Sequence, residues 1–381
     1  KEGKFDYITP KAPKGEKPYR FNWQTPILLS SHNQDILYIG SEFLQRSMNQ
    51  GETWERISGD LTNGAKEGNV AFGTISTISE SKFQFGLLYT GSDDGKIHVS
   101  KDGGVSWQLI SGNLPQNLWV SRVVASSHKK ERVYVTLNGY RNDNFESYAF
   151  VSEDFGATWT SISNGLTQAV NVIVEDSANE NILYVGTDNG LFISIDKGVN
   201  WQDFSNGMPK VAIHDAVIQT KAKELIVGTH GRSIYKMDIS KVQELTKDVL
   251  AKNLHLFKVN DRTKSERWGS QNYAWGKPSE PSQTIWFYSN ADGIVNVSIT
   301  NEAGMLVHAQ KVEAKKGLNS FAYNYLLSKE VAEKWNKKDK NIKIKEAENK
   351  KFYLPVGKYK MTVSKDKVTE TKSFEVTAPK K

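Results

Sequence analysis

Residues 194 to 201 read S-I-D-K-G-V-N-W, and the chain repeats this frame of Ser, Asp, Gly and Trp three more times. The other copies are S-M-N-Q-G-E-T-W from Ser47, S-K-D-G-G-V-S-W from Ser100 and S-E-D-F-G-A-T-W from Ser152. Successive copies begin 53, 52 and 42 residues apart. Internal repeats of about 40 to 50 residues are typical of propeller blades or solenoid units.

Short β-rich runs surround the frames and distinguish between these two repeat classes. A hairpin precedes each frame, as in I-L-Y-V-G-T-D-N-G-L-F-I-S, which ends at Ser194. Its Asp-Asn-Gly is a typical chain reversal. Another strand lies before the hairpin, as at residues 170–176, and a further one starts at the Trp. Four antiparallel strands per unit at this spacing predict a β-propeller.

The predicted fold is all-β, with four full blades and a partial fifth that begins at Val211 and lacks the frame. After the blades, Ser240 and Gln243 have the spacing of a helix capping box. From about His255, short alternating strands predict a β-sandwich of immunoglobulin or fibronectin type III character. The predicted parts are an N-terminal segment (1–22), the propeller blades (23–238), a linker helix (239–254) and the sandwich (255–381), with a Lys-rich insertion (329–351).

Composition excludes several classes of protein. The 381 residues contain no Cys, which excludes a disulfide scaffold, a thiolate zinc site and a Cys nucleophile. No apolar run approaches the roughly 20 residues of a membrane-spanning helix. The net charge of +7 is uneven, since residues 251–381 carry 25 basic and 14 acidic residues. The Lys-rich insertion mixes acids with lysines and has almost no Arg, so we predict a solvated segment and no nucleic-acid partner.

The frame itself is predicted to be structural. A Ser hydroxyl and an Asp carboxylate can accept backbone N–H bonds that a turn leaves unpaired. Gly fits a left-handed backbone position, and Trp fills the gap between neighbouring blades. The first copy has Asn in place of Asp, a change that a ligand site would tolerate poorly, and one carboxylate per copy is too few for calcium. The structural residues are Ser47, Asn49, Gly51, Trp54, Ser100, Asp102, Gly104, Trp107, Ser152, Asp154, Gly156, Trp159, Ser194, Asp196, Gly198 and Trp201.

The S-x-D-x-G-x-[ST]-W pattern resembles the Asp-box, or bacterial neuraminidase repeat, of a propeller superfamily. Three further features, R-F-N-W-Q-T-P-I at residues 20–27, V-G-T-H-G-R-S-I-Y at 227–235 and the closing sandwich, resemble sortilin-like or glycosyl-hydrolase-like repeat proteins frequent in Bacteroidetes. This resemblance covers nearly the whole chain. It implies an exported protein of the periplasm, the outer-membrane surface or the exterior.

An open arc of blades would expose two apolar blade faces, which a soluble monomer tolerates poorly. Proteins of this kind carry more blades upstream. The resemblance therefore implies that this chain corresponds to the C-terminal half of such a protein. Either upstream blades, covalent or cleaved but still bound, complete the ring, or residues 5–9 close five blades as the missing outer strand. We favour upstream blades as the partner of this chain.

Candidate ligand-binding residues lie on the turns between the middle strands and in the long loop of the third blade. A glycosidase needs two carboxylates about 5 to 10 Å apart, but Asp-rich turns also serve the backbone alone. No nucleophile motif, phosphate loop, metal site or cofactor site is evident. The candidates are Glu42, Asp93, Asp94, Arg141, Asp188, His230 and Arg232.

The function that these patterns favour is a non-catalytic binding or scaffolding propeller of the bacterial envelope, which engages protein or glycan. A glycoside hydrolase of the sialidase or xyloglucanase type, with part of its active site in upstream blades, is the alternative. A third hypothesis is a receptor that binds a peptide in its central tunnel, as in sortilin.

Overall fold

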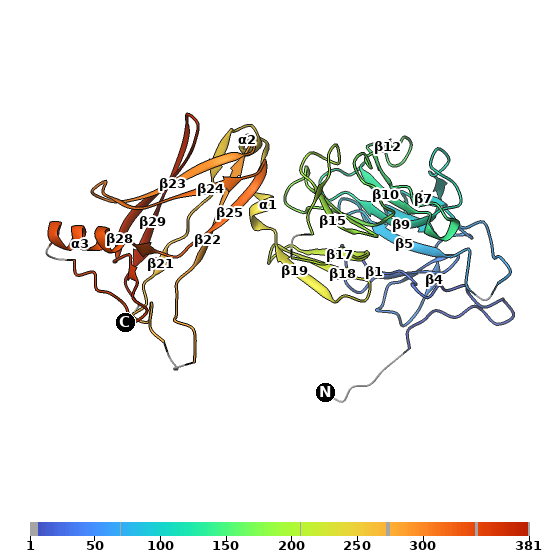
Figure 1. The fold of residues 1–381 in the computed structure, drawn as a ribbon. Coiled ribbons are helices and arrows are strands. Elements are labelled where there is room, and N and C mark those ends of the chain that lie inside the picture. The colour runs from blue at the N-terminus through green and yellow to red at the C-terminus, as the bar shows by residue number, and fades with distance from the viewer. Residues whose placement is uncertain (1–6, 69, 206, 272–274, 340–341, 380–381) are drawn as a thin grey trace. The chain divides into compact units, whose positions relative to one another are not determined.

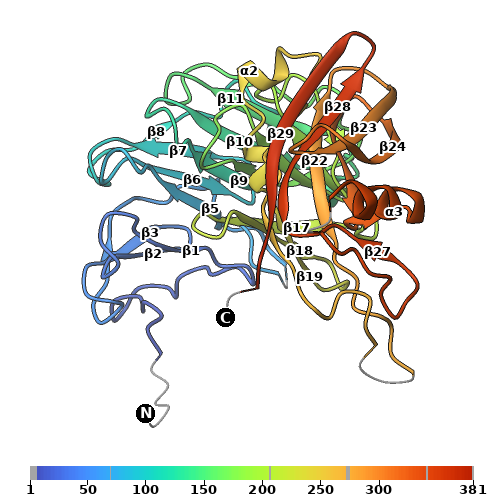
Figure 2. The ribbon, with the colours of Figure 1, turned by 90° about the vertical axis from the view of Figure 1, so that its left-hand side faces the viewer.

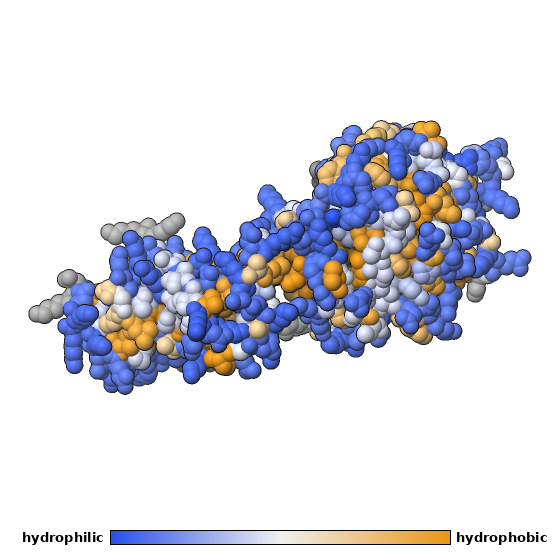
Figure 3. Space-filling model, turned by 90° about the horizontal axis from the view of Figure 1, so that it is seen from above, coloured by the Kyte–Doolittle hydropathy of each residue, from blue (hydrophilic) through white to orange (hydrophobic). Residues whose placement is uncertain are grey.

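The computed structural model describes residues 7–68, 70–205, 207–271, 275–339 and 342–379 (Figure 1). The outer strand predicted at residues 5–9 therefore lies partly outside the described residues, as do parts of the N-terminal segment and of the Lys-rich insertion. The chain divides into two compact units, at residues 1–243 and 244–381. Each unit has its own surface, on which hydrophobic patches alternate with larger hydrophilic areas (Figure 3).

The first unit is built from the predicted blades. Among the residues of this unit that the structure describes, four antiparallel sheets have four strands each and a fifth has three. Figure 2 shows the sheets of blades 1, 2 and 3 following one another. The strands are β1 (Ile27–Leu29), β2 (Leu37–Gly40), β3 (Leu44–Ser47) and β4 (Glu55–Arg56) in blade 1; β5 (Ile75–Glu80), β6 (Leu88–Ser92), β7 (Ile97–Ser100) and β8 (Gln108–Leu109) in blade 2; β9 (Trp119–Ala125), β10 (Val133–Asn138), β11 (Tyr148–Ser152) and β12 (Thr160–Ser161) in blade 3; β13 (Val170–Glu175), β14 (Leu183–Thr187), β15 (Gly190–Ser194) and β16 (Gln202–Asp203) in blade 4; and β17 (Ile213–Gln219), β18 (Glu224–Thr229) and β19 (Ile234–Asp238) in blade 5.

Each frame forms the turn between the third and fourth strands of its blade. The Ser hydroxyl accepts the backbone N–H of the Gly at 2.7 to 2.8 Å. The Asp or Asn accepts the backbone N–H of the residue before the Trp at 2.8 to 2.9 Å. All four glycines have φ between 88° and 96°, a backbone conformation that other residues rarely adopt. The polar atoms of the frame are thus used inside the turn.

The Trp of each frame joins two successive blades. Its indole Nε1 donates to the backbone oxygen of an isoleucine that directly follows the outer strand of the preceding blade: Trp107 to Ile57 at 2.8 Å, Trp159 to Ile110 at 2.8 Å and Trp201 to Ile162 at 2.6 Å. Trp54, in blade 1, makes the same bond at 2.7 Å to Ile8 of the N-terminal segment. Ile8 therefore takes the position that an outer strand supplies in the other blades.

A second contact between blades comes from a tyrosine on the second strand of a blade. Tyr38 on β2 donates to Glu80 on β5 at 3.0 Å, and Tyr134 on β10 donates to Glu175 on β13 at 3.0 Å. Both pairs are buried. Tyr89 on β6 is equally buried, but its hydroxyl has no hydrogen-bond partner, because Ala125 stands at the position of the glutamate. We call this contact the tyrosine–glutamate pair.

The two ends of the blade series have uncovered faces. On β1, Ile27 is 63% exposed and Leu29 is 58% exposed. On blade 5, Val217 is 57% exposed and Ile234 is 72% exposed. Among the described residues, β19 pairs only with β18, and residues 7–9 join no sheet.

The predicted linker helix is two short helices, α1 (Ser240–Gln243) and α2 (Lys247–Leu250). In α1, the Gln243 amide reaches the buried Asp176 of blade 4 at 3.1 Å, whereas the backbone N–H of Ser240 is bound by Asp238. The predicted capping box is therefore replaced by a tertiary contact.

The second unit has two sheets over one core. Buried residues from both sheets, among them Phe287, Val297, Met361 and Phe374, belong to a single cluster. The Lys-rich stretch begins with a helix, α3 (Lys329–Lys338), capped by Ser328. One sheet contains β20 (Leu254–Leu256), β22 (Gln283–Ser289) and β25 (Gly317–Tyr323); the other contains β21 (Arg262–Thr263), β29 (Val368–Thr377), β28 (Gly357–Lys365), β23 (Gly293–Asn301) and β24 (Leu306–Ala314); β26 (Leu326–Leu327) and β27 (Phe352–Tyr353) form a separate pair.

Candidate functional site

The first strands of the blades surround a cavity of about 730 Å³ in the propeller unit. Residues from all five blades line it, so the cavity lies where the inner strands converge. Its apolar lining includes residues of β1 and β5, and its polar lining is concentrated on blades 3 to 5. The polar and aromatic lining includes Trp119, Arg122, Asn138, Arg141, Asn171, Asp188, His214, Asp215 and His230.

Arg141 lies on the long loop of blade 3, as the sequence predicts, and lines the cavity. Its guanidinium carbon is 4.1 Å from the centre of the Trp119 ring, a cation–π contact. The loop forms a short 3-10 helix, Tyr140–Asn142, and Asn142 fixes it by donating to the backbone of Asn117 at 2.7 Å. The contact orients the Arg141 side chain while leaving its N–H groups available to a ligand.

Asp188 ends a chain of amide hydrogen bonds along the cavity wall. Asn138 donates to Asn171 at 2.7 Å, and Asn171 donates to Asp188 at 2.8 Å. Asn138 and Asn171 are buried, and the register places them on adjacent blades. The chain of hydrogen bonds orients one oxygen of the Asp188 carboxylate.

Two histidines of blade 5 stand beside this carboxylate. The rings of His214 and His230 are 5.2 Å apart. Surrounding protein groups displace water from His214 and lower its pKa; His230 and Arg141 lower it further, while Asp188 acts in the opposite direction. Such clusters of coupled titratable groups in a cavity are typical of functional sites.

Arg122 and Asp215 form an ion pair across the cavity. The Arg122 guanidinium on β9 is 2.7 Å from the Asp215 carboxylate on β17. Since these strands belong to blades 3 and 5, the pair spans the centre of the arc. Asp188 is the other carboxylate among the residues that line the cavity.

The structure brings together Arg141, Asp188 and His230 of the predicted residues and separates the rest from the cavity. Glu42 accepts the backbone N–H of Arg20 at 2.7 Å, and Asp94 accepts that of Asn63 at 2.6 Å. Asp93 is buried and accepts from both the backbone and the hydroxyl of Thr74. These three carboxylates accept hydrogen bonds from backbone N–H groups outside the cavity.

Arg232 is exposed and does not line the cavity. Four further residues that line the cavity were not predicted from the sequence, and all of them lie on strands: Trp119, Asn138, Asn171 and His214. An alternating strand pattern gives no sign of which residues face a shared centre.

Among the residues that the structure describes, no group of three or more His, Asp or Glu side chains is arranged to hold a metal ion. No helix among them is long and apolar enough to cross a membrane.

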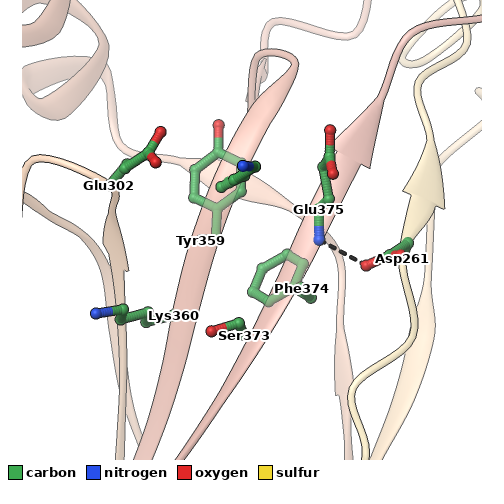
Figure 4. A pocket seen from close by; sticks show the side chains of 8 residues that line it. Asp261, Glu302, Tyr359, Lys360, Ser373, Phe374 and Glu375 are labelled. Carbon is green, nitrogen blue, oxygen red and sulfur yellow. Dashed lines mark hydrogen bonds between the residues drawn. The ribbon is translucent and has the colours of Figure 1, made fainter.

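A smaller pocket of about 260 Å³ lies in the second unit (Figure 4). Lys360 of β28 and Ser373 and Glu375 of β29 line it, and Asp261 accepts the backbone N–H of Glu375 at 2.8 Å. Asp261 directly precedes β21, which pairs with β29, so this bond lies at the end of that strand pairing. The pocket therefore has a structural explanation and is not a candidate site.

Comparison with known proteins supports a β-propeller of the sortilin type. Residues 42–168, which are 127 of the 381 residues, match the family model described as sortilin, neurotensin receptor 3. No curated protein matches the chain.

Two solved structures illustrate the likeness to glycosyl-hydrolase propellers. The GH74 enzyme of Niastella koreensis is 21% identical, with a TM-score of 0.43, over 56% of this chain and 36% of its own. The GH74 xyloglucanase of Xanthomonas campestris is 12% identical, with a TM-score of 0.46, over 94% of this chain and 55% of its own. The chain thus spans well under two thirds of either protein. Such distant likeness assigns no activity to it.

Proposed function

We propose that the propeller unit is a non-catalytic binding module and that its ligand, a protein segment or a glycan, enters the central cavity. The observation that carries this proposal is the convergence of Arg141, Asp188, His214 and His230 on one cavity from three different blades. Arg141, His214 and His230 stand where the other blades have different residue types, whereas Asp188 shares its residue type with Asp93 of blade 2. Residues that repeat from blade to blade are explained by the fold, so residues that differ around a shared cavity favour a role in ligand recognition.

The partners of the two cavity carboxylates favour binding over hydrolysis. A glycosidase acid must carry a proton near neutral pH, and a second carboxylate must stand about 5 to 10 Å away. Asp188 accepts a hydrogen bond from Asn171, and Asp215 is paired with Arg122. Each carboxylate therefore already has a protein partner inside the cavity, and it would have to give up that contact to approach a glycosidic bond.

The second candidate function is a glycoside hydrolase. It is supported by the presence of two carboxylates in one cavity that opens to solvent, and it would require Asp188 or Asp215 to exchange its present partner for substrate.

The proposal includes the setting and the second unit. We place the protein at the envelope or the exterior of a bacterium, on the strength of the resemblance of its repeats. We also propose that the second unit is an immunoglobulin- or fibronectin-like module that presents the propeller. Its two sheets over one core are of the right kind for such a module.

Binding and hydrolysis are separated by one experiment with matched variants. The purified chain is tested against arrays of polysaccharides and peptides, and dissociation constants are measured for every hit with wild type, Arg141→Ala and Lys101→Gln. Lys101 lies over the Phe155 ring at 4.3 Å outside the cavity, and it is the control for loss of a cation–π contact. We expect Arg141→Ala alone to lose about tenfold or more in affinity, since one charged hydrogen bond contributes about 1.5 to 3 kcal/mol.

Two outcomes contradict the proposal. Release of reducing ends from any polysaccharide, abolished by Asp188→Asn, would establish the hydrolase instead. Equal affinity of all three proteins for every ligand would place recognition outside the cavity.

A further inference from the structure

His214 lies at a position where the first strand of several blades has the same irregularity. It is the unpaired residue of a β-bulge in β17. The corresponding bulges in blades 2, 3 and 4 hold Ser76, Ser121 and Asn171. A bulge redirects the side chain that it carries, and all four of these side chains line the central cavity.

In blades 2 and 3 the fold itself uses the bulge residue. The Ser76 hydroxyl donates to the backbone oxygen of Val120 at 2.7 Å, and the Ser121 hydroxyl donates to that of Val170 at 2.8 Å. Each serine therefore joins two successive blades. The imidazole of His214 makes no bond of this kind, since its ring nitrogens have no hydrogen-bond partner among the described residues.

Blades 4 and 5 place different pairs of side chains at the same two positions. In blade 4 the bulge residue Asn171 donates to Asp188 of the inner turn at 2.8 Å. In blade 5 the equivalent residues are His214 and His230, whose ring centres are 5.2 Å apart. We call these two residues the histidine pair. The amide and the carboxylate of blade 4 bond to each other, whereas the histidine pair leaves ring nitrogens available to a ligand.

The charges around the histidine pair nearly cancel while both imidazoles are neutral. Arg122 and Asp215 are paired with each other at 2.7 Å. The charge of Arg141 is offset by that of Asp188 in the same cavity. Each proton that the histidine pair takes up therefore adds a positive charge that no further carboxylate among the described lining residues offsets. An anionic ligand can supply that missing negative charge.

Arg141 is the group that can hold such an anion beside the histidine pair. Among the described residues, no carboxylate lies at ion-pair distance from its guanidinium, which binds carboxylates through two parallel hydrogen bonds. Burial lowers the pKa of His214 most, and the charges of His230 and Arg141 lower it further, while Asp188 acts in the opposite direction. An anion bound to Arg141 would remove much of this repulsion and favour the charged imidazole.

The lining favours a sugar acid as the source of the anion. Because Asp188 stands in the same cavity, the ligand has to bring hydrogen-bond donors together with its negative charge. A uronic acid carries hydroxyl groups and a carboxylate on one ring. Tyr140 lines the cavity, is 61% exposed and is held by an edge contact with Phe145, so the apolar C–H face of a sugar ring can pack on it.

We infer that the cavity binds a carboxylate of an acidic glycan between Arg141 and the histidine pair, and that protonation of the pair tightens this binding as the pH falls. The inference rests on the proposed binding function of the cavity. A sugar carboxylate stays ionised down to about pH 4, whereas histidines titrate in the range between pH 5 and 8. Since the bound anion stabilises the imidazolium form, binding takes up protons and is tightest at the lower pH.

The test measures dissociation constants of uronic-acid oligosaccharides at pH 7.5 and pH 5.5. Oligomers of galacturonate, glucuronate and mannuronate are each compared with their methyl esters, which keep the sugar ring and lose the charge. We expect at least one acid to bind, with an affinity about fivefold higher at pH 5.5 than at pH 7.5. Its ester should bind more weakly and without this pH dependence. Calorimetry in buffers of different ionisation enthalpy should show that protons are taken up on binding.

Two variants copy the residues of blade 4 into blade 5. His214→Asn should lose most of the gain in affinity between pH 7.5 and pH 5.5. His214→Asn combined with His230→Asp recreates the Asn171–Asp188 pair and adds a carboxylate, so it should lower the affinity for the acid by tenfold or more at both pH values. His308→Gln, on β24 of the second unit, is the control and should keep the wild-type pH dependence.

Several results would overturn the inference. These are no binding of any of the acids, equal affinity at both pH values, or full pH dependence in His214→Asn. A neutral glycan or a peptide that depends on Arg141 at both pH values would also overturn it, but would leave the proposed function standing. If no ligand of any kind depends on Arg141, the inference and the proposed function are both wrong.

Discussion

The outer turns of the propeller and its central cavity use similar residue types in opposite ways. In the outer turns, four frames repeat the same hydrogen bonds, and each carboxylate is held by groups of its own turn. At the inner turns, one equivalent position carries Glu42, Asp93, Asn138, Asp188 and His230 in successive blades. A residue that repeats in every blade is therefore explained by the fold, whereas a position that differs from blade to blade can contribute to a ligand site.

The largest effect is expected from removing a Trp of the frame. Trp159→Ala deletes an indole that packs in the blade core and donates to Ile110, and it should lower the free energy of unfolding by about 3 kcal/mol. Trp23→Ala is the matched control, because Trp23 is 87% exposed, and it should change stability by less than about 0.5 kcal/mol. Urea unfolding measures both. Equal effects would show that the frame does not join the blades.

A smaller effect should separate two tyrosines at equivalent positions. Tyr134→Phe leaves the buried Glu175 without one of its donors and should cost about 1 to 3 kcal/mol. Tyr89→Phe removes a buried hydroxyl that has no partner, and it should be neutral or slightly stabilising. The same unfolding assay compares them. A cost at Tyr89 as large as that at Tyr134 would contradict the tyrosine–glutamate pair.

The smallest effect concerns acid stability. Hydrogen bonds from Thr158 hold the pKa of Asp154 at about 2, below the 3.8 of an unperturbed Asp. A lowered pKa in the folded state stabilises the fold above pH 4, and this contribution is lost as the pH falls from 4 to 2. Asp154→Asn should therefore flatten the pH dependence of stability in that window only. Unfolding titrations between pH 2 and 7 check this, and an unchanged acid limb would contradict it.

Much of the propeller could be predicted because its signals are local. A frame of eight residues contains its own hydrogen-bond donors and acceptors, so Ser152 and Asp154 can be assigned without knowing the rest of the chain. The tyrosine–glutamate pair was missed because its two members lie about 40 residues apart and neither is unusual in a strand. The same limit applies to Asn138 and Asn171, which meet only when blades 3 and 4 pack.

The candidate site was only partly predictable for a related reason. Asp93 and Asp188 occupy the same turn position, but one binds the backbone of Thr74 and the other faces the cavity. A turn sequence does not reveal which groups stand within reach of its carboxylate. Arg141 was found because an unusually long loop is visible in sequence.

The most direct test of a structural frame and a ligand-binding cavity compares one residue of the outer turns with one residue of the cavity. Unfolding free energy at pH 7 and ligand affinity are both measured for Asp154→Asn and for Arg141→Ala, using whichever array hit binds wild type most tightly. We predict that Asp154→Asn keeps full affinity, and that Arg141→Ala loses affinity while its free energy of unfolding stays within about 0.5 kcal/mol of wild type. A loss of affinity in Asp154→Asn with full affinity in Arg141→Ala would place the ligand at the frame. It would contradict both the structural role of the frame and the binding role of the cavity.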